Sequence, residues 1–323
     1  GGVDVERGRV DVHQLHVRNR RQDSCLDLGD IGVFQPEIGQ KRNNRSVHIH
    51  PYAFALLRSQ VSLAPTPFVA YSDDMVIREE HCFYPDHVIY SDPSQHGFVK
   101  DDFLVQDRLH GWLIQPRDGR KTDATVVHLH GNAENMTSHV SASLFLPELG
   151  HRLVTFDYSG YGRSKGEPSL RQIQDDARAV FQHVFAHPEI FGEVIFGLGQ
   201  SMGAYTLARI LPDLPALKGA VLEAGLYSFH ALFAQAYPQI RCEIPEEGFS
   251  ALDTLPLSAV PKLFIHGTAD AVVPYSHSVK MHEVAAEPKE LVILDGVGHI
   301  DALVSRHARE YMLKVHTFIE KNS

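Results

Sequence analysis

Short apolar runs recur along most of the chain and predict a set of β-strands. Two of them, Phe103–Asp107 and Leu109–Ile114, meet near Asp107 and predict an antiparallel pair. Six later runs are continuously apolar, which is typical of strands that are covered on both faces of a sheet. These six runs are Thr125–His130, Leu153–Asp157, Glu193–Leu198, Gly219–Glu223, Lys262–His266 and Leu291–Asp295.

Segments with apolar residues at helical spacing separate these runs. Ser169 is expected to cap one helix, with Gln172 three residues later completing a capping box. A second helix is expected over Met202–Leu211, where Pro212 ends it, and a third over about Asp301–Glu320. Alternating strands and helices predict an α/β fold with a mostly parallel, doubly wound sheet. Ligands of such sheets bind at the carboxyl ends of the strands, so the residues there are the candidates for chemistry.

The first 74 residues differ from the rest of the chain. They hold nine basic and nine acidic residues, no methionine and little apolar periodicity before about Tyr52. We expect a poorly structured N-terminal extension over residues 1–74 and one folded domain over 75–323. The functional alternative for the extension is a pro-segment or a partner-binding arm. His48 and His50 lack further ligands at zinc spacing, so no metal site is expected there.

Composition and charge exclude several classes of function. The chain has 323 residues and a formal net charge of −10, which disfavours non-specific binding to nucleic acid or to an anionic membrane. It contains neither a run of about 20 apolar residues nor a recognisable secretory signal. Cys25, Cys82 and Cys242 are too few and too scattered for a disulfide framework or a zinc site. We therefore expect a cytoplasmic protein.

The segment Gly199–Gly203 is a G-x-S-x-G sequence between a predicted strand and a predicted helix. In that context the motif forms a nucleophile elbow, a sharp turn that presents a serine hydroxyl above the sheet. Glycine on both sides allows the strand and helix backbones to approach closely. Ser201 would then lie at a helix N-terminus, where the helix dipole favours developing negative charge. We predict that Ser201 is a nucleophile.

A serine nucleophile needs a base and a group that orients the base. Asp270 lies in a tight loop after the run that ends at His266, and His299 lies in a loop of small residues after the last strand. The chain order Ser201, Asp270, His299 is the serine–acid–histidine order of catalytic triads on a doubly wound sheet with a nucleophile elbow. Glu223, at the end of a neighbouring strand, is the alternative acid.

The loop that follows the first parallel strand is expected to contribute to an oxyanion hole. Acyl transfer passes through a tetrahedral oxyanion, which requires preorganised N–H donors. We assign this role to the backbone N–H groups of Asn132 and Met202, with Ala133 as the alternative to Asn132. His128 and His130 share a predicted strand face, and we expect them to pack or to orient the loop rather than to bind a metal.

From about residue 81 to its end, the chain resembles the α/β-hydrolase superfamily. The resemblance is strongest to the branch with an H-G-N-A loop, which includes depalmitoylating hydrolase-domain proteins and many bacterial hydrolases. It rests on Phe83–Pro85, Leu109–Trp112, His130–Asn135, Asp157–Ser164, Gly199–Gly203, His266–Asp270 and Gly298–His299. It implies an α/β-hydrolase fold and serine-dependent hydrolysis of an ester, thioester or amide without a cofactor.

The number of residues between the fourth and fifth predicted parallel strands limits the size of any segment that could cover the site. Residues 228–261 have room for one or two short helices, so we expect no large lid and a preference for small or linear acyl groups. The apolar residues there either pack in the core or line an acyl pocket: Phe229, Leu232, Phe233 and Tyr237. We predict a carboxylesterase that acts on a small ester or acylated molecule. An acyl-protein thioesterase or a serine peptidase is the alternative enzyme, and a non-catalytic hydrolase fold used for binding is the alternative from another class.

Overall fold

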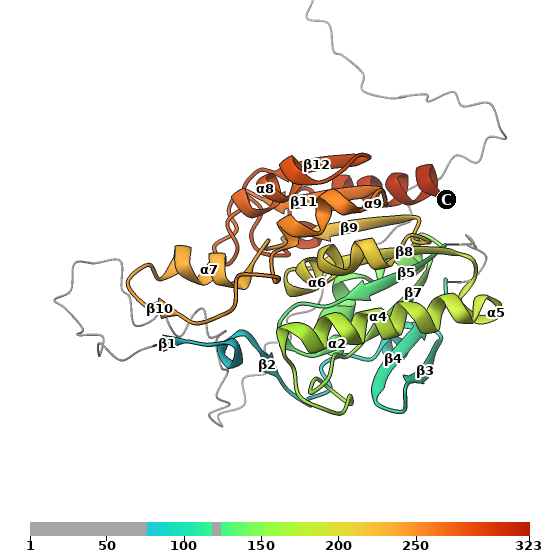
Figure 1. The fold of residues 1–323 in the computed structure, drawn as a ribbon. Helices are drawn as coiled ribbons and strands as arrows, with labels where there is room; N and C mark the ends of the chain where they lie inside the picture. The colour runs from blue at the N-terminus through green and yellow to red at the C-terminus, as the bar shows by residue number, and fades with distance from the viewer. Residues whose placement is uncertain (1–75, 118–123) are drawn as a thin grey trace, which may run out of the picture. The chain divides into compact units, whose positions relative to one another are not determined.

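The computed structural model describes residues 76–117 and 124–323. Eight of the strands in these residues form one sheet in the order β12-β11-β9-β8-β5-β7-β4-β3 (Figure 1). Their bounds are Lys100–Val105 for β3, Leu109–Ile114 for β4, Ala124–Leu129 for β5, Arg152–Phe156 for β7, Val194–Gln200 for β8, Gly219–Glu223 for β9, Lys262–Gly267 for β11 and Lys289–Leu294 for β12. The predicted extension over residues 1–74, with His48 and His50, lies outside the described residues.

The sheet is mostly parallel, as the alternation of strands and helices predicts. The neighbouring strands from β7 through β5, β8, β9 and β11 to β12 all pair in parallel. The β3–β4 and β4–β7 pairs are antiparallel. Every residue of β4, β5, β9 and β11 is buried. This burial explains why these strands have continuous apolar runs in the sequence rather than an alternating pattern.

Helices cover both faces of the sheet. Figure 1 shows α4 and α6 side by side in front of the strands, with α9 behind them. The helical bounds are Met136–His139 for α2, Phe145–Glu148 for α3, Leu170–Ala186 for α4, Pro188–Phe191 for α5, Met202–Ile210 for α6, Phe229–Ala236 for α7, Ser276–Val284 for α8 and Ala308–Asn322 for α9. None of the helices in the described residues combines the length and the apolar character that crossing a membrane requires.

Two local details of the helices differ from the predictions. The Ser169 hydroxyl accepts a hydrogen bond from the backbone N–H of Gln172, as predicted, but the return bond of a capping box is replaced. The Gln172 amide instead donates to Asp176 at 2.8 Å, because that carboxylate lies one turn further along the same face. The last helix begins at Ala308 rather than near Asp301. The Ser305 hydroxyl accepts the backbone N–H of His307, and such a local bond competes with helix formation.

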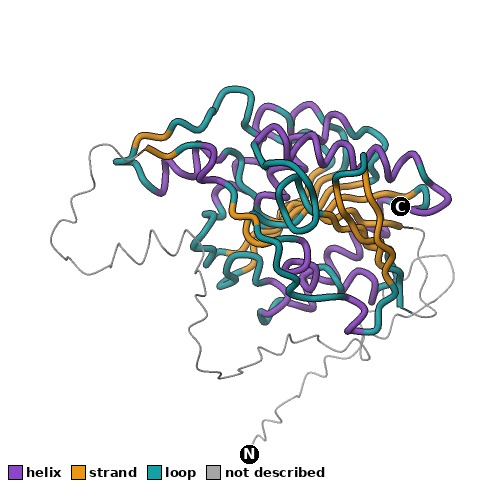
Figure 2. Tube along the Cα trace, turned by 90° about the horizontal axis from the view of Figure 1, so that it is seen from below, coloured by secondary structure: helices purple, strands orange, loops and turns teal. Residues whose placement is uncertain are grey.

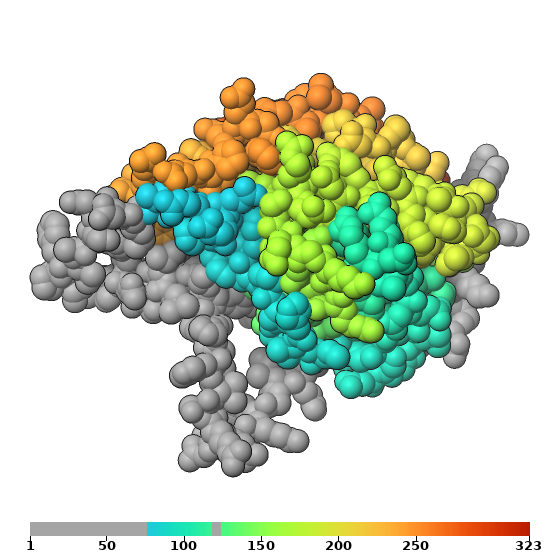
Figure 3. Space-filling view, turned by 60° about the horizontal axis from the view of Figure 1, so that its bottom comes forward, coloured from blue at the N-terminus to red at the C-terminus, as the bar shows by residue number. Residues whose placement is uncertain are grey.

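The segment between β9 and β11 is small, as predicted. It contains α7, the two-residue strand β10 (Arg241–Cys242) and two short 3₁₀ turns. β10 pairs in parallel with β1 (Val76–Ile77), and Figures 2 and 3 show where these two parts of the chain meet. The apolar residues singled out in this segment are buried in the main core, which supports a packing role: Phe229, Leu232, Phe233 and Tyr237. No large lid is present in the described part of the chain.

Candidate active site

The turn that contains Ser201 joins β8 directly to α6. Ser201 has a φ of 55° and a ψ of −113°, a backbone conformation that a non-glycine residue adopts only when the surroundings impose it. A Cβ atom on Gly203 would lie 1.9 Å from the Leu129 carbonyl oxygen, and one on Gly199 would lie 2.4 Å from the Gly203 carbonyl oxygen. The close approach of strand and helix therefore requires glycine at both positions, and it lifts the Ser201 hydroxyl above the end of the sheet.

The structure brings Ser201, Asp270 and His299 together from three different strand ends. The Nε2 atom of His299 lies 3.0 Å from the Ser201 Oγ atom, and its Nδ1 atom lies 2.7 Å from Asp270 Oδ2. With the proton on Nδ1, the ring donates to the carboxylate and leaves the Nε2 lone pair to accept the serine hydroxyl proton. The three residues predicted from the sequence thus form one continuous hydrogen-bonded chain.

The Asp270 carboxylate is held firmly in place. Its side chain is fully buried, and its Oδ1 atom accepts hydrogen bonds from the backbone N–H groups of Val272 and Val273, each at 2.8 Å. Burial alone would raise the pKa of Asp270, but hydrogen bonds from His266 and His299 outweigh it and hold this pKa well below its ordinary value. Asp270 is therefore an anion that can offset the charge of a protonated His299 ring.

A second histidine, His266 near the end of β11, also contacts the acid. The Nε2 atom of His266 lies 3.0 Å from Asp270 Oδ2 and 2.9 Å from the Val273 carbonyl oxygen. Its Nδ1 atom lies 2.7 Å from the Ser278 hydroxyl on α8. A donor at Nε2 and an acceptor at Nδ1 satisfy all three contacts. The spacing of His266, four residues before Asp270 at a strand end, is the signal that could have identified it.

Glu223, the alternative acid, is engaged elsewhere. Its Oε2 atom accepts hydrogen bonds from the Gln200 amide at 2.8 Å and from the Tyr311 hydroxyl at 2.7 Å. Burial raises the pKa of Glu223 despite these two bonds. The Gln200 amide oxygen in turn lies 2.9 Å from His128 Nε2. Glu223 thus belongs to a buried polar network beneath the serine turn, and the structure favours Asp270 as the partner of His299.

The loop with Asn132 lies against the start of α6. The space beside Gly203 is occupied by the Leu129 and His130 carbonyl oxygens, so the end of β5 touches the serine turn. The Asn132 side chain accepts a hydrogen bond from the Tyr161 hydroxyl at 3.0 Å, which fixes the loop. Met202 is the first residue of α6, and a backbone N–H at that position has no partner within its own helix. Both donors assigned to the oxyanion hole therefore belong to elements that meet beside Ser201.

His128 in β5 and His130, just after that strand, both have structural contacts. His128 lies within hydrogen-bonding distance of Gln200 and Thr155, and His130 Nδ1 lies 2.7 Å from the Gly131 carbonyl oxygen. Burial lowers the pKa of both imidazoles, so both are neutral at pH 7. This geometry supports the predicted loop-orienting role.

Comparisons with known proteins agree with the geometry. A family model described as "Serine aminopeptidase, S33" matches residues 120–247. The chain is 32% identical over 243 residues to the uncharacterized protein YfhR of Escherichia coli K12, covering 73% of this chain and 85% of YfhR. It is also 32% identical over 202 residues to the alpha/beta hydrolase domain-containing protein aho-3 of Caenorhabditis elegans, covering 61% of this chain and 57% of aho-3.

Solved structures with a similar fold include a protein described as an esterase. The Pyrococcus furiosus esterase Pf2001 superposes with a TM-score of 0.61 at 20% identity, covering 74% of this chain and 96% of the esterase. Est1E from Butyrivibrio proteoclasticus superposes with a TM-score of 0.54 at 17% identity, covering 69% of this chain and 98% of Est1E. At these identities the superpositions establish the fold alone, whereas the relation to YfhR extends over most of both sequences. The chain therefore belongs to the α/β-hydrolase superfamily.

Proposed function

We propose that this protein is a serine hydrolase that cleaves carboxylic esters of small or linear acyl groups through an acyl-enzyme. The observation that carries the proposal is the hydrogen-bonded chain from Ser201 through His299 to Asp270, with distances of 3.0 and 2.7 Å. A histidine hydrogen-bonded between a serine hydroxyl and a buried carboxylate is the arrangement that activates serine. The proposed partner is a small ester or acylated molecule, in the cytoplasmic setting that the free thiols of Cys82 and Cys242 favour.

The proposed reaction has two stages. The Ser201 oxygen attacks the ester carbonyl carbon while His299 Nε2 takes the hydroxyl proton, and Asp270 offsets the charge of the imidazolium. The backbone N–H groups of Met202 and Asn132 stabilise the oxyanion. His299 then gives its proton to the departing alcohol. In the second stage a water molecule, deprotonated by His299, attacks the acyl-enzyme and releases the acid and the free Ser201 hydroxyl.

The segment between β9 and β11 limits the size of the acyl group. That segment holds only α7, β10 and short turns, and its apolar side chains are used in the core. Such a cover favours small or linear acyl chains over large lipid aggregates. The name of the esterase Pf2001 favours an oxygen ester. The name of the matching family model favours a serine peptidase as the second candidate.

Activity-based labelling tests the proposal. The wild-type protein should react with a fluorophosphonate probe and hydrolyse p-nitrophenyl esters, with the highest kcat/KM at short acyl chains. Ser201→Ala should lose the labelling and nearly all of the hydrolysis, while Ser276→Ala, an exposed serine at the start of α8, should keep both. An aminoacyl p-nitroanilide and an acyl thioester, tested in the same assay, separate peptidase and thioesterase activity from esterase activity. Labelling of the Ser201→Ala variant at the wild-type rate would refute the proposal, and a folded wild type that reacts with no substrate would indicate a binding protein.

A further inference from the structure

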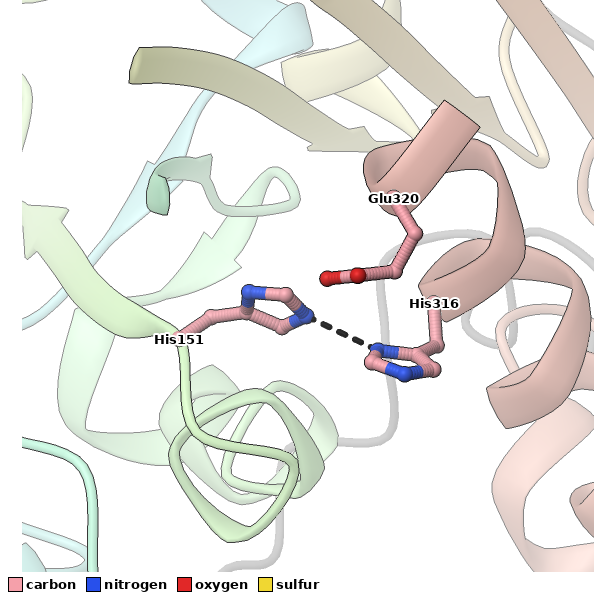
Figure 4. A group of neighbouring side chains, drawn as sticks. All are labelled: His151, His316 and Glu320. Atoms are coloured by element: carbon pink, nitrogen blue, oxygen red, sulfur yellow. Dashed lines mark hydrogen bonds between the residues drawn. The ribbon is translucent and has the colours of Figure 1, made fainter. Parts of the chain in front are cut away.

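A second cluster of polar side chains lies apart from the three residues of the candidate active site. It consists of His151, His316 and Glu320, whose ligand atoms all lie within 4.8 Å of one another (Figure 4). The Nε2 atom of His151 lies 3.0 Å from the Nδ1 atom of His316. His151 is fully buried, the His316 residue is 9% exposed, and Glu320 is exposed to solvent. Among the residues that the structure describes, no second group of three such side chains comes this close.

The cluster lies at the opposite end of the sheet from Ser201. His151 directly precedes β7, so it lies at the amino end of a parallel strand. Tyr311, near the start of α9, reaches Glu223 at the carboxyl end of β9, whereas Phe318, two turns later, packs against Gly219 at the amino end of that strand. The last turns of α9 therefore lie at the amino ends of the strands. The cluster has no part in the chemistry proposed for Ser201.

The spacing of the residues suits a single ion. His316 and Glu320 are four residues apart on α9, so they project from the same face of the helix on successive turns. The two imidazole nitrogens are 3.0 Å apart, and two nitrogens bound to one tetrahedral zinc ion are separated by about 3.3 Å. The carboxylate of Glu320 points toward this nitrogen pair in Figure 4. A rotation of the Glu320 side chain completes three ligands.

The hydrogen bond between the two rings would give way to the ion. One of the two facing nitrogens carries a proton in this bond, because two lone pairs cannot form it. A metal ion needs both facing lone pairs, so its binding would release that proton to the solvent.

We propose that His151, His316 and Glu320 bind one divalent transition-metal ion, with Zn²⁺ as the preferred ion. Two imidazoles and one carboxylate are ligands that zinc commonly takes, and water from the exposed side would fill the fourth position. Magnesium and calcium favour oxygen ligands and are poor candidates. The ion would connect the end of α9 to the start of β7, two elements that are 165 residues apart in sequence at this contact. Binding of the ion would therefore stabilise the folded protein.

Zinc binding to the full chain, stripped of metal with a chelator, tests the proposal. Calorimetric titration with Zn²⁺ should reveal one tight site, and Zn²⁺ at 100 times Kd should raise the melting temperature by about 5 °C. The chain has 21 histidines, so weak binding elsewhere has to be separated by variants. Glu320→Gln and His316→Asn should each weaken the site at least tenfold. His183→Asn, a matched change in another pair of neighbouring histidine rings, should leave it intact.

Cobalt provides a second readout that does not depend on stability. Co²⁺ at the site should give the visible absorption of a four-coordinate ion, and Zn²⁺ should displace it. Because Glu320 is exposed, Glu320→Gln keeps the test valid even if His316→Asn fails to fold. The esterase rate of Glu320→Gln should equal that of the wild type, so this test is independent of the proposed function. The proposal is overturned if Glu320→Gln binds Zn²⁺ as tightly as the wild type, or if Zn²⁺ does not raise the melting temperature of the wild type.

Discussion

His266 contacts the acid of the candidate active site but lies outside the predicted triad. Asp270 accepts hydrogen bonds from two histidines and two backbone N–H groups, and only one of these four donors belongs to the predicted triad. The other three donors fix the orientation of the carboxylate independently of His299. Since His266 contacts the acid and not the serine, its role is to position Asp270.

Replacing His266 should therefore impair catalysis through Asp270. We expect His266→Ala to lower kcat for a p-nitrophenyl ester about tenfold or more, because a hydrogen bond to a buried charge is lost, with little change in KM. His266→Gln, whose amide can still donate toward Asp270, should restore much of the rate. A purely structural role would instead predict that both variants lose stability in parallel and that the folded fraction keeps its full kcat.

The identity of the acid is tested by a pair of substitutions. Asp270→Asn should lower the rate by roughly 10⁴-fold, because an amide stabilises the wrong tautomer of His299. Glu223→Gln should change the rate far less, since Glu223 is bonded to Gln200 and Tyr311. Steady-state kinetics on both variants, corrected for folded protein, decide the matter. If Glu223→Gln lost most of the rate while Asp270→Asn lost little, Glu223 and not Asp270 would be the acid.

The lowered pKa of Asp270 predicts how the stability of the protein depends on pH. The pKa of this carboxyl is lowered in the folded protein, so folding stabilises the ionised form of the Asp270 side chain. The resulting stability is fully present above the unfolded pKa of about 3.9 and is lost as the pH falls below it toward the folded pKa. The melting temperature of Asp270→Asn should therefore lie below that of the wild type at pH 7, and the gap should narrow below about pH 4. Thermal unfolding of both proteins between pH 7 and pH 3 provides the measurement, and a gap that widens on acidification would contradict the assignment.

At the scale of elements, the contact between β5 and α6 is the tightest constraint on the site. A side chain on Gly203 would collide with backbone atoms of Leu129 and His130, which cannot rotate away. The strand, the serine turn and the helix are thereby locked into one geometry. That geometry is also what gives Ser201 its unusual φ.

Gly203→Ala should accordingly be severely destabilising. We expect a loss of roughly 3 kcal/mol or more in the free energy of unfolding, since β5 and α6 would have to separate. Gly248→Ala is the control: Gly248 has a φ of 73° with nothing within 4 Å of an added Cβ, so only backbone strain of about 1 kcal/mol is expected. Urea unfolding compares the two variants. Equal stability losses would show that backbone strain, and not the close approach, dominates at Gly203.

The strands could be predicted from the sequence because burial on both faces produces continuous apolar runs. β4 and β9 have the predicted bounds, and the other strands of the main sheet that were predicted differ at their ends by only a few residues. The two-residue strands β1 and β10 were missed, because their pairing joins residues 165 positions apart and leaves no local pattern. The start of α9 was missed because a hydroxyl contact of Ser305 decides it.

At the scale of the whole molecule, the topology explains why the candidate site could be predicted. Ser201 and His299 are 98 residues apart, and Asp270 and His299 are 29 apart, yet parallel strands bring all three loops to one end of the sheet. Side chains that meet by packing rather than by topology were not predictable. The group of His151, His316 and Glu320 belongs to this second kind.

The boundary of the catalytic unit can be tested by truncation. Residues 1–74 have balanced charge and little apolar periodicity, so we predict that a chain beginning at Met75 folds and hydrolyses esters as the full chain does. That chain keeps β1, whose Ile77 is buried in the core and whose pairing with β10 supports the segment after β9. A chain beginning at Phe83 removes β1 and should melt at a lower temperature. Expression, melting temperature and esterase rate of the three chains give the comparison. If the chain from Met75 is insoluble, or loses most of its rate at an equal amount of folded protein, the first 74 residues are part of the working enzyme.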